Sequence, residues 1–320
     1  MNIDILLSNL TNPTLLFFIL GIIAASCKSD LEIPAPSVKF ISLYLLFAIG
    51  FKGGQELQHS NLSAEIYLSI AFGMLIATLI PLYSFFLIKK RVGVSNAGSI
   101  AAAYGSVSAV TFVAAATFLE IQGLNYGGHM VAVMAMMEFP AIVVGFILIR
   151  KFEKQSAQDI SLKNIVGHAL TNGSVLMIVG SLVIGIISDS RQAEGIKPFT
   201  NDIFKGFLAI FLLEMGMLTA RRFKAFRTHG LYVMFFALII PAVNGSAVAY
   251  LSQFVSHETG NRFIFSILAA SASYIAVPAA MRLAAPKADP GLYIPMALGV
   301  TFPFNITLGM PLYYYIISLN

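Results

Sequence analysis

The chain reads Gly-Ser-Val-Ser at Gly105–Ser108 and Ala-Ser-Ala-Ser at Ala270–Ser273, and each stretch lies in the middle of a long apolar segment. The second stretch starts 165 residues after the first (270 minus 105), about half of the chain further on. Interruptions rich in small residues, at matching positions of two halves, are the best sequence pointer to the binding site of a transporter. The pair therefore predicts two similar halves with a site between them.

The composition is that of a membrane protein. Of the 320 residues, 58% are hydrophobic and only 11% are charged, and the mean hydropathy is +0.82. A soluble domain carries about 25% charged residues. Because lipid offers no hydrogen bonds to the backbone, we expect an all-α polytopic protein. Cys27 is the one cysteine, which excludes an intrachain disulfide and any metal site that needs several thiolates.

Apolar runs bounded by Pro, Gly and charged clusters predict ten transmembrane helices. Five of them precede a central loop near residues 151–171, and five follow it. Their approximate limits are 13–27, 36–51, 65–88, 97–119, 128–150, 173–189, 203–219, 229–253, 262–283 and 291–317.

The basic residues predict an orientation. With the loops numbered in order, the odd loops hold fifteen of the 20 Lys and Arg residues. Cytoplasmic loops carry the excess of positive charge, so we expect the odd loops in the cytoplasm and both termini outside. The five basic residues of the other side are Lys52, Arg191, Lys197, Lys205 and Arg262.

The two halves correspond at a nearly constant offset, which predicts an internal repeat of residues 1–160 and 161–320. Since each half has an odd number of spans, the second copy is inverted, as in many secondary transporters. The alternative is that Gly, Ser and Pro simply recur where membrane helices pack closely. The matching pairs are Gly50 with Gly216, Pro81 with Pro241, Ser106 with Ser271, Ser108 with Ser273, and Pro140 with Pro303.

If both helices break at these stretches and cross at mid-membrane, the half-helices that follow begin there with their N-termini together. Free N–H groups and the positive ends of the helix dipoles favour a small anion. Carbonyls freed at the breaks can bind Na⁺. No Arg or Lys lies near either break, which favours a small, weakly charged anion. The hydroxyl donors are those of Ser106, Ser108, Thr111, Ser271 and Ser273.

Polar residues inside other spans are further candidates. A charged side chain at bilayer depth costs about 2.5–3.5 kcal/mol on insertion scales, so Glu138 is expected to bind a cation or carry a proton. A hydrogen bond between helices is the alternative, and Glu214 ranks lower because it lies on a different pair of spans. Asn305 follows Pro303 in the span that corresponds to that of Glu138. Its ordinary role would be a hydrogen bond between helices.

At these residues the chain resembles the cyanobacterial-type sodium-dependent bicarbonate transporters, over essentially its whole length. The two breaks with the residues that follow them carry most of the resemblance. The stretches concerned are 12–15, 33–34, 49–54, 104–112, 138–141, 215–217, 270–282 and 285–290.

The resemblance implies a gate domain of about residues 1–60 and 173–225, and a core domain of about 61–155 and 226–320. It implies a homotrimer in the bacterial inner membrane that takes up HCO₃⁻ with Na⁺ by alternating access, with no other cofactor. The anion is expected between the breaks, and Na⁺ or a proton nearby. The anion residues would be Gly105, Ser106, Ser108, Thr111, Ser271, Ser273 and Tyr274, and the cation residues Glu138, Ser108, Ser271 and Asn305.

The chain departs from the family at its central loop. The loop has about 20 residues on these limits, whereas cyanobacterial members often carry a longer insertion, which puts control by a PII-like partner in doubt. Two other functions stay open: a Na⁺- or H⁺-coupled symporter of another small anion, such as a monocarboxylate, and a membrane sensor without transport. The lack of a nucleotide-binding motif or catalytic domain argues against a primary pump or an enzyme.

Overall fold

A computed structural model describes residues 11–59, 63–153, 167, 171–226 and 230–319. These residues form helices and connecting loops, with no strand among them. Most of the central loop lies outside the described residues, including Lys154 and Lys163. The expectation of an all-α protein is thus confirmed for the part that is described.

The helices follow the predicted spans closely. The first half contains α2 (Pro13–Ser26), α3 (Ala35–His59), α4 (Ala64–Val92), α5 (Val94–Gly105), α6 (Ala109–Ile121) and α7 (His129–Phe152). The second half begins with α9 (Gly173–Ile187), α10 (Ser190–Glu194), η1 (Pro198–Asp202), α11 (Phe204–Phe226), α12 (Leu231–Leu251) and η3 (Ser252–Phe254). It ends with α13 (Thr259–Ala270), α14 (Ala276–Ala284), α15 (Pro290–Met296), η4 (Ala297–Thr301), α16 (Phe302–Phe304), η5 (Asn305–Gly309) and α17 (Met310–Ser318).

Seven helical segments among the described residues are long and apolar enough to cross a membrane. Two shorter apolar helices, α2 and α9, fall on the first and sixth predicted spans, and α13 with α14 falls on the ninth. Outward-facing side chains such as Leu68, Leu75 and Phe86 on α4 are large, apolar and exposed, as a lipid-facing surface requires. The chain is therefore a membrane protein, and the count of ten spans stays a prediction.

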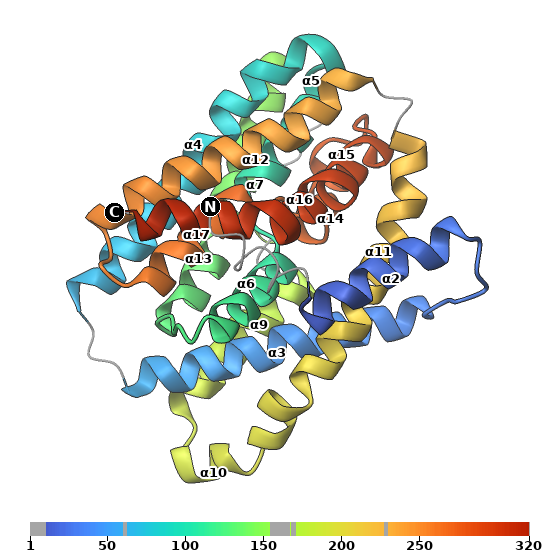
Figure 1. Ribbon diagram of the computed structural model, residues 1–320. Coiled ribbons are helices and arrows are strands. Elements are labelled where there is room, and N and C mark those ends of the chain that lie inside the picture. The colour runs from blue at the N-terminus through green and yellow to red at the C-terminus, as the bar shows by residue number, and fades with distance from the viewer. Residues whose placement is uncertain (1–10, 60–62, 154–166, 168–170, 227–229, 320) are drawn as a thin grey trace.

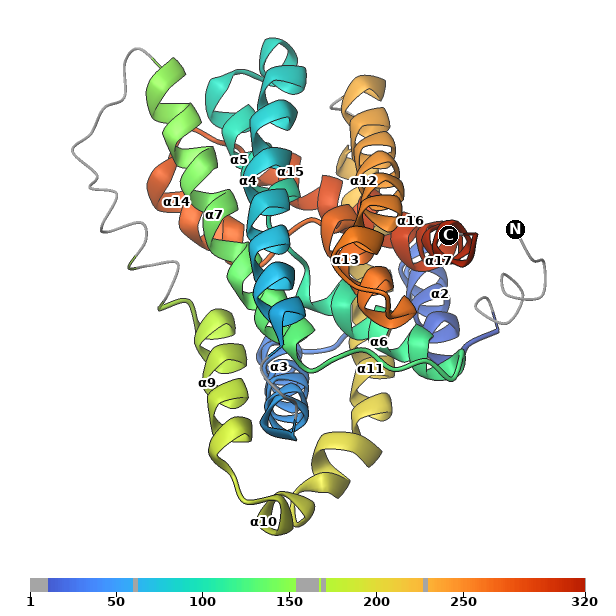
Figure 2. The same ribbon diagram turned by 90° about the vertical axis from the view of Figure 1, so that its left-hand side faces the viewer.

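Four helices form a group that we call the frame, namely α2, α3, α9 and α11. In Figure 1, α3 lies below α6, α13 and α17, and α2 and α11 lie on the right, while Figure 2 shows α9 beside α3. The pairs α3–α9 and α2–α11 have the most extensive contacts of the described chain. Both pairs join a helix of the first half to one of the second.

Glycines allow the frame helices to touch backbone to backbone. On α3, a Cβ at Gly54 would collide with the Leu182 carbonyl of α9. On α11, a Cβ at Gly216 would collide with the Phe18 carbonyl of α2. Small residues at such crossings let membrane helices approach closely and gain van der Waals contact.

The other helices form a second group that we call the bundle, consisting of α4 to α7 and α12 to α17. Its helices α4, α5 and α7 pack on one another, and α12 packs on α13 and α17. Tyr104 of α5 shares a hydrogen bond of 2.8 Å with Thr301 of η4, and the Thr301 hydroxyl donates to the Ala237 carbonyl of α12 at 2.7 Å. The bundle is thus tied across the two halves of the chain by buried polar contacts.

Candidate functional site

Two helices are interrupted where the small-residue stretches lie. Helix α5 ends at Gly105 and α6 begins at Ala109, while α13 ends at Ala270 and α14 begins at Ala276. Extended backbone replaces the helix at Ser106 (ψ 179°), Ser108 (ψ 109°) and Ser271 (ψ 168°). The breaks therefore free backbone groups inside the bundle, and these groups need partners.

The two breaks supply partners for each other. The N–H of Ser273 donates to the Ala103 carbonyl at 2.8 Å, and the N–H of Ser108 donates to the Ser271 hydroxyl at 3.0 Å. The Ser271 hydroxyl in turn donates to the Leu268 carbonyl at 2.9 Å. Segments more than 160 residues apart in sequence are thereby joined side by side.

A serine hydroxyl at each break also accepts a hydrogen bond from the first turn of the helix that follows, although only Ser108 occupies an N-cap position, since that of α14 is Ile275. The Ser108 hydroxyl accepts from the Thr111 N–H at 3.2 Å at the start of α6. The Ser273 hydroxyl accepts from the Val277 N–H at 3.3 Å at the start of α14. Each bond satisfies one of the free N–H groups at a helix N-terminus and leaves the others free.

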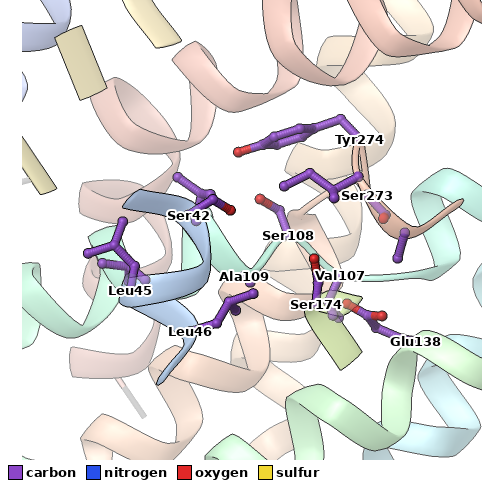
Figure 3. Close-up of a pocket in the computed structure, with 14 residues that line it drawn as sticks. Ser42, Leu45, Leu46, Val107, Ser108, Ala109, Glu138, Ser174, Ser273 and Tyr274 are labelled. Atoms are coloured by element: carbon purple, nitrogen blue, oxygen red, sulfur yellow. The ribbon is translucent and has the colours of Figure 1, made fainter. Parts of the chain in front are cut away.

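A pocket lies where these two helix starts face the frame, and we call it the break pocket (Figure 3). It offers a volume of about 20 Å³ to the centres of water-sized molecules, which is room for about one water. The bundle contributes Val107, Ser108, Ala109, Val110, Val113, Glu138, Ser273, Tyr274, Ile275 and Ala276, and the frame contributes Ser42, Leu45, Leu46 and Ser174.

Glu138 brings a carboxylate to the break pocket from α7. Its Oε2 atom is buried and has no hydrogen-bond partner among the described residues. In Figure 3 this side chain and Ser174 lie on one side of the pocket and Tyr274 on the opposite side. A buried carboxylate oxygen without a partner calls for a proton, a cation or a water.

Other predicted site residues lie beside the pocket and not on its wall. Asn305 donates to the Ala270 carbonyl at 2.7 Å and accepts from the Tyr313 hydroxyl at 3.2 Å, so it holds the end of α13. At Gly105, a Cβ would collide with the ring of Pro81. Thr111 and Ser106 are buried next to the break, and the Ser106 hydroxyl has no partner among the described residues.

Sequence reasoning missed the residues that the frame brings to the pocket. Ser42 is a single hydroxyl in an apolar run and Ser174 lies at the start of one, and the packing of α3 and α9 against the bundle places them there. One signal existed for Ser174, because it follows Asn172, whose side chain accepts from the Ser174 N–H at 3.0 Å and caps α9. Glu214, the second buried carboxylate, lies in the frame on α11 and does not line the break pocket.

Comparison with known families gives one match. The family model described as the Na⁺-dependent bicarbonate transporter superfamily matches residues 13–318, nearly the whole chain. A comparison with curated proteins gives no match.

Proposed function

The chain belongs to the Na⁺-dependent bicarbonate transporter superfamily, and from that membership we propose that it carries HCO₃⁻ together with Na⁺ by alternating access. Membership in a transporter family implies a membrane carrier and not an enzyme. Na⁺ is then cargo, and no further cofactor is needed. The observation that carries the proposal is the break pocket, where two helix N-termini and an unpartnered carboxylate oxygen meet.

We assign the two ions to different walls of this pocket. The anion lies against the N-termini of α6 and α14, with Ser108, Ser273 and Tyr274 as its side-chain contacts. Na⁺ lies at Glu138, which supplies the oxygen ligand and the negative charge. The remaining predicted residues act by keeping the breaks in shape: Gly105, Ser106, Thr111, Ser271 and Asn305.

We also propose that the chain is an inverted repeat of five plus five spans. Equivalent contacts in the two halves support it. Gly50 of α3 packs on the Ile178 carbonyl of α9, and Gly216 of α11 packs on the Phe18 carbonyl of α2. The N-caps agree as well, because Asn12 caps α2 as Asn172 caps α9, each through the N–H two residues on. Residues 1–160 and 161–320 are the two copies in this proposal.

In the same proposal the frame is the gate domain and the bundle is the core domain. The break pocket is lined by both, so a shift of one against the other changes its volume. With room for about one water, the pocket must widen to take an anion of four non-hydrogen atoms. The proposal also includes a homotrimer in a bacterial inner membrane, which the family resemblance supports. Both termini lie outside, which the distribution of basic residues among the loops supports.

Uptake of labelled bicarbonate into vesicles that contain the purified protein tests this function. We expect uptake that depends on an inward Na⁺ gradient and that is lost when Ser108→Phe fills the break pocket. Ser69→Ala is the control, because Ser69 is buried on α4 and its hydroxyl has no partner among the described residues. Absence of Na⁺-dependent uptake by the unaltered protein would overturn the proposal.

A second candidate follows from Glu138. A buried carboxylate can carry a proton as well as bind Na⁺. The protein would then be an H⁺-coupled symporter of a small monocarboxylate. Vesicles with a pH gradient and K⁺ in place of Na⁺ distinguish the two, since only the second candidate predicts uptake under these conditions.

A further inference from the structure

A second and larger cavity, which we call the charged cavity, lies between the frame and the bundle. Its volume is about 450 Å³ on the same measure that gives about 20 Å³ for the break pocket. Its wall comes from α3, α6, the α6–α7 loop, η1 and the start of α11. The wall includes four charged residues, Lys52, Glu56, Glu120 and Lys205, and the small residue Ala116.

The charged cavity lies next to the break pocket along the same two helices, α3 and α6. On α3, Leu46 lines the break pocket and Ile49 lines the charged cavity. On α6, Val113 lines the break pocket and Ala116 lines the charged cavity. Three residues of helix correspond to about 4.5 Å along the axis. The two cavities are therefore separated by less than one helical turn of apolar side chains.

The charges on the wall of the charged cavity are balanced. Lys205 of the frame and Glu120 of the bundle pair with each other at 2.8 Å, and their side chains are 58% and 61% exposed. Exposed pairs of this kind contribute little to stability, so this one does not lock the cavity shut. Lys52 and Glu56 are the other two charges, four residues apart on α3.

Lys52 and Glu56 are available to ions. Among the described residues, neither side chain has an ion pair within 4.0 Å or a hydrogen bond. The two side chains interact with each other only through their opposite charges, without a direct contact. Apolar walls, here those of Ile49, Leu124 and Phe204, strengthen the field of such charges inside a cleft. One free positive and one free negative charge in one cavity suit a pair of opposite small ions.

We propose that the charged cavity is a waiting site for both transported ions, in which Lys52 holds the small oxyanion and Glu56 holds the Na⁺ before they enter the break pocket. This inference rests on the proposed function for the identity of the ions. The site itself follows from the size of the cavity, its two free charges and its position less than one helical turn from the break pocket.

Thiol labelling tests the waiting site without relying on transport. The exposed Cys27 is replaced by Ser, and Ala116→Cys places one reporter thiol on the wall of the charged cavity. Its reaction rates with an anionic and a cationic methanethiosulfonate reagent are compared. Where Ala116→Cys proves unreactive, Asn201→Cys on the same wall reports instead.

We expect Lys52→Gln to lower the ratio of anionic to cationic rates about tenfold, and Glu56→Gln to raise it by a similar factor, since each charge acts on the two reagents with opposite sign. Lys39→Gln is the matched control, because it removes an exposed charge from the other end of α3. Bicarbonate should slow the labelling with Lys52 present and fail to slow it in Lys52→Gln. Equal ratios in all variants would overturn the waiting site.

Transport kinetics separate this inference from the proposed function. If both hold, Lys52→Gln raises the KM for HCO₃⁻ several-fold and Glu56→Gln raises the KM for Na⁺, with maximal rates nearly unchanged. If the rate ratios shift and bicarbonate slows the labelling only with Lys52 present, but no Na⁺-dependent bicarbonate uptake exists, ion binding in the charged cavity stands and the proposed function fails. If uptake exists and the ratios do not move, the waiting site alone is wrong.

Discussion

The N–H of Ser108 donates a hydrogen bond of 3.0 Å to the hydroxyl of Ser271, and this bond joins the two helix breaks. Both residues are buried, so the bond is shielded from bulk water. The backbone bond from Ser273 to Ala103 lies beside it and runs in the opposite sense between the same two segments. The geometry of each break therefore depends on the other.

Replacement of Ser271 by Ala tests this dependence. The change leaves the buried Ser108 N–H without its acceptor, which costs about 1–3 kcal/mol for a buried polar group. We expect a lower melting temperature of the purified protein and reduced uptake. Ser69→Ala should leave both unchanged, because its hydroxyl makes no hydrogen bond among the described residues. Equal stability of the two variants would show that the bond contributes nothing.

Replacement of Glu138 by Gln tests the cation site. The amide keeps the size of the side chain and one of its oxygens but removes the charge, so Na⁺ binds more weakly. We expect the Na⁺ concentration for half-maximal uptake to rise at least about tenfold, the equivalent of about 1.4 kcal/mol. Glu214→Gln is the control, since it removes from the frame a carboxylate that also has one buried oxygen without a hydrogen-bond partner among the described residues. An unchanged Na⁺ dependence in Glu138→Gln would remove this residue from the site.

Replacement of Gly54 by Ala tests the close packing of the frame. The added methyl group would collide with the Leu182 carbonyl, so α3 and α9 must move apart. Overpacking of this kind costs about 1–3 kcal/mol. We expect thermal unfolding at a lower temperature, whereas Gly180→Ala on α9 should have no such effect because nothing lies within 4 Å of its added Cβ. Similar unfolding temperatures for both variants would contradict the packing.

A reversible cross-link tests whether the bundle moves against the frame. In the Cys27→Ser background, Glu120→Cys with Lys205→Cys places thiols on the bundle and the frame at the 2.8 Å ion pair. We expect a bifunctional thiol reagent to stop uptake and a reductant to restore it.

The control cross-link lies within the bundle. Ser95→Cys with Glu153→Cys joins α5 to the end of α7, where the Ser95 hydroxyl donates to Glu153 at 2.6 Å. This link should leave uptake intact. Full uptake with the first link in place would mean that transport needs no motion between frame and bundle.

Sequence patterns located the breaks because similar stretches of small residues lie at matching positions of two apolar runs. They placed the end of the second span at residue 51, whereas α3 continues to His59. The reason is physical: Lys52 marks the edge of the apolar stretch, and a helix can continue beyond it as long as its backbone bonds are made. This extension carries Lys52 and Glu56 to the charged cavity.

The sequence does not predict which residues of the frame line the break pocket. Ser42 and Ser174 face the pocket because α3 and α9 cross with backbone contact, a relation between residues more than 130 positions apart. Asn305 shows the same limit. The sequence indicates that its polar side chain lies inside a span, but its bond to the Ala270 carbonyl depends on how the last span packs against α13. The roles assigned to all these residues stay predictions until ion binding is measured.

The pairing of α2 with α11 and of α3 with α9 has a consequence for biosynthesis. The main partners of α2 and α3 lie roughly 130 residues or more further along the chain, so both helices remain in the lipid without these partners until the second half is inserted. A chain truncated after α7 would keep α4, α5 and α7 packed together but leave α2 and α3 without their main partners. The two halves expressed as separate polypeptides should therefore need each other to escape membrane quality control.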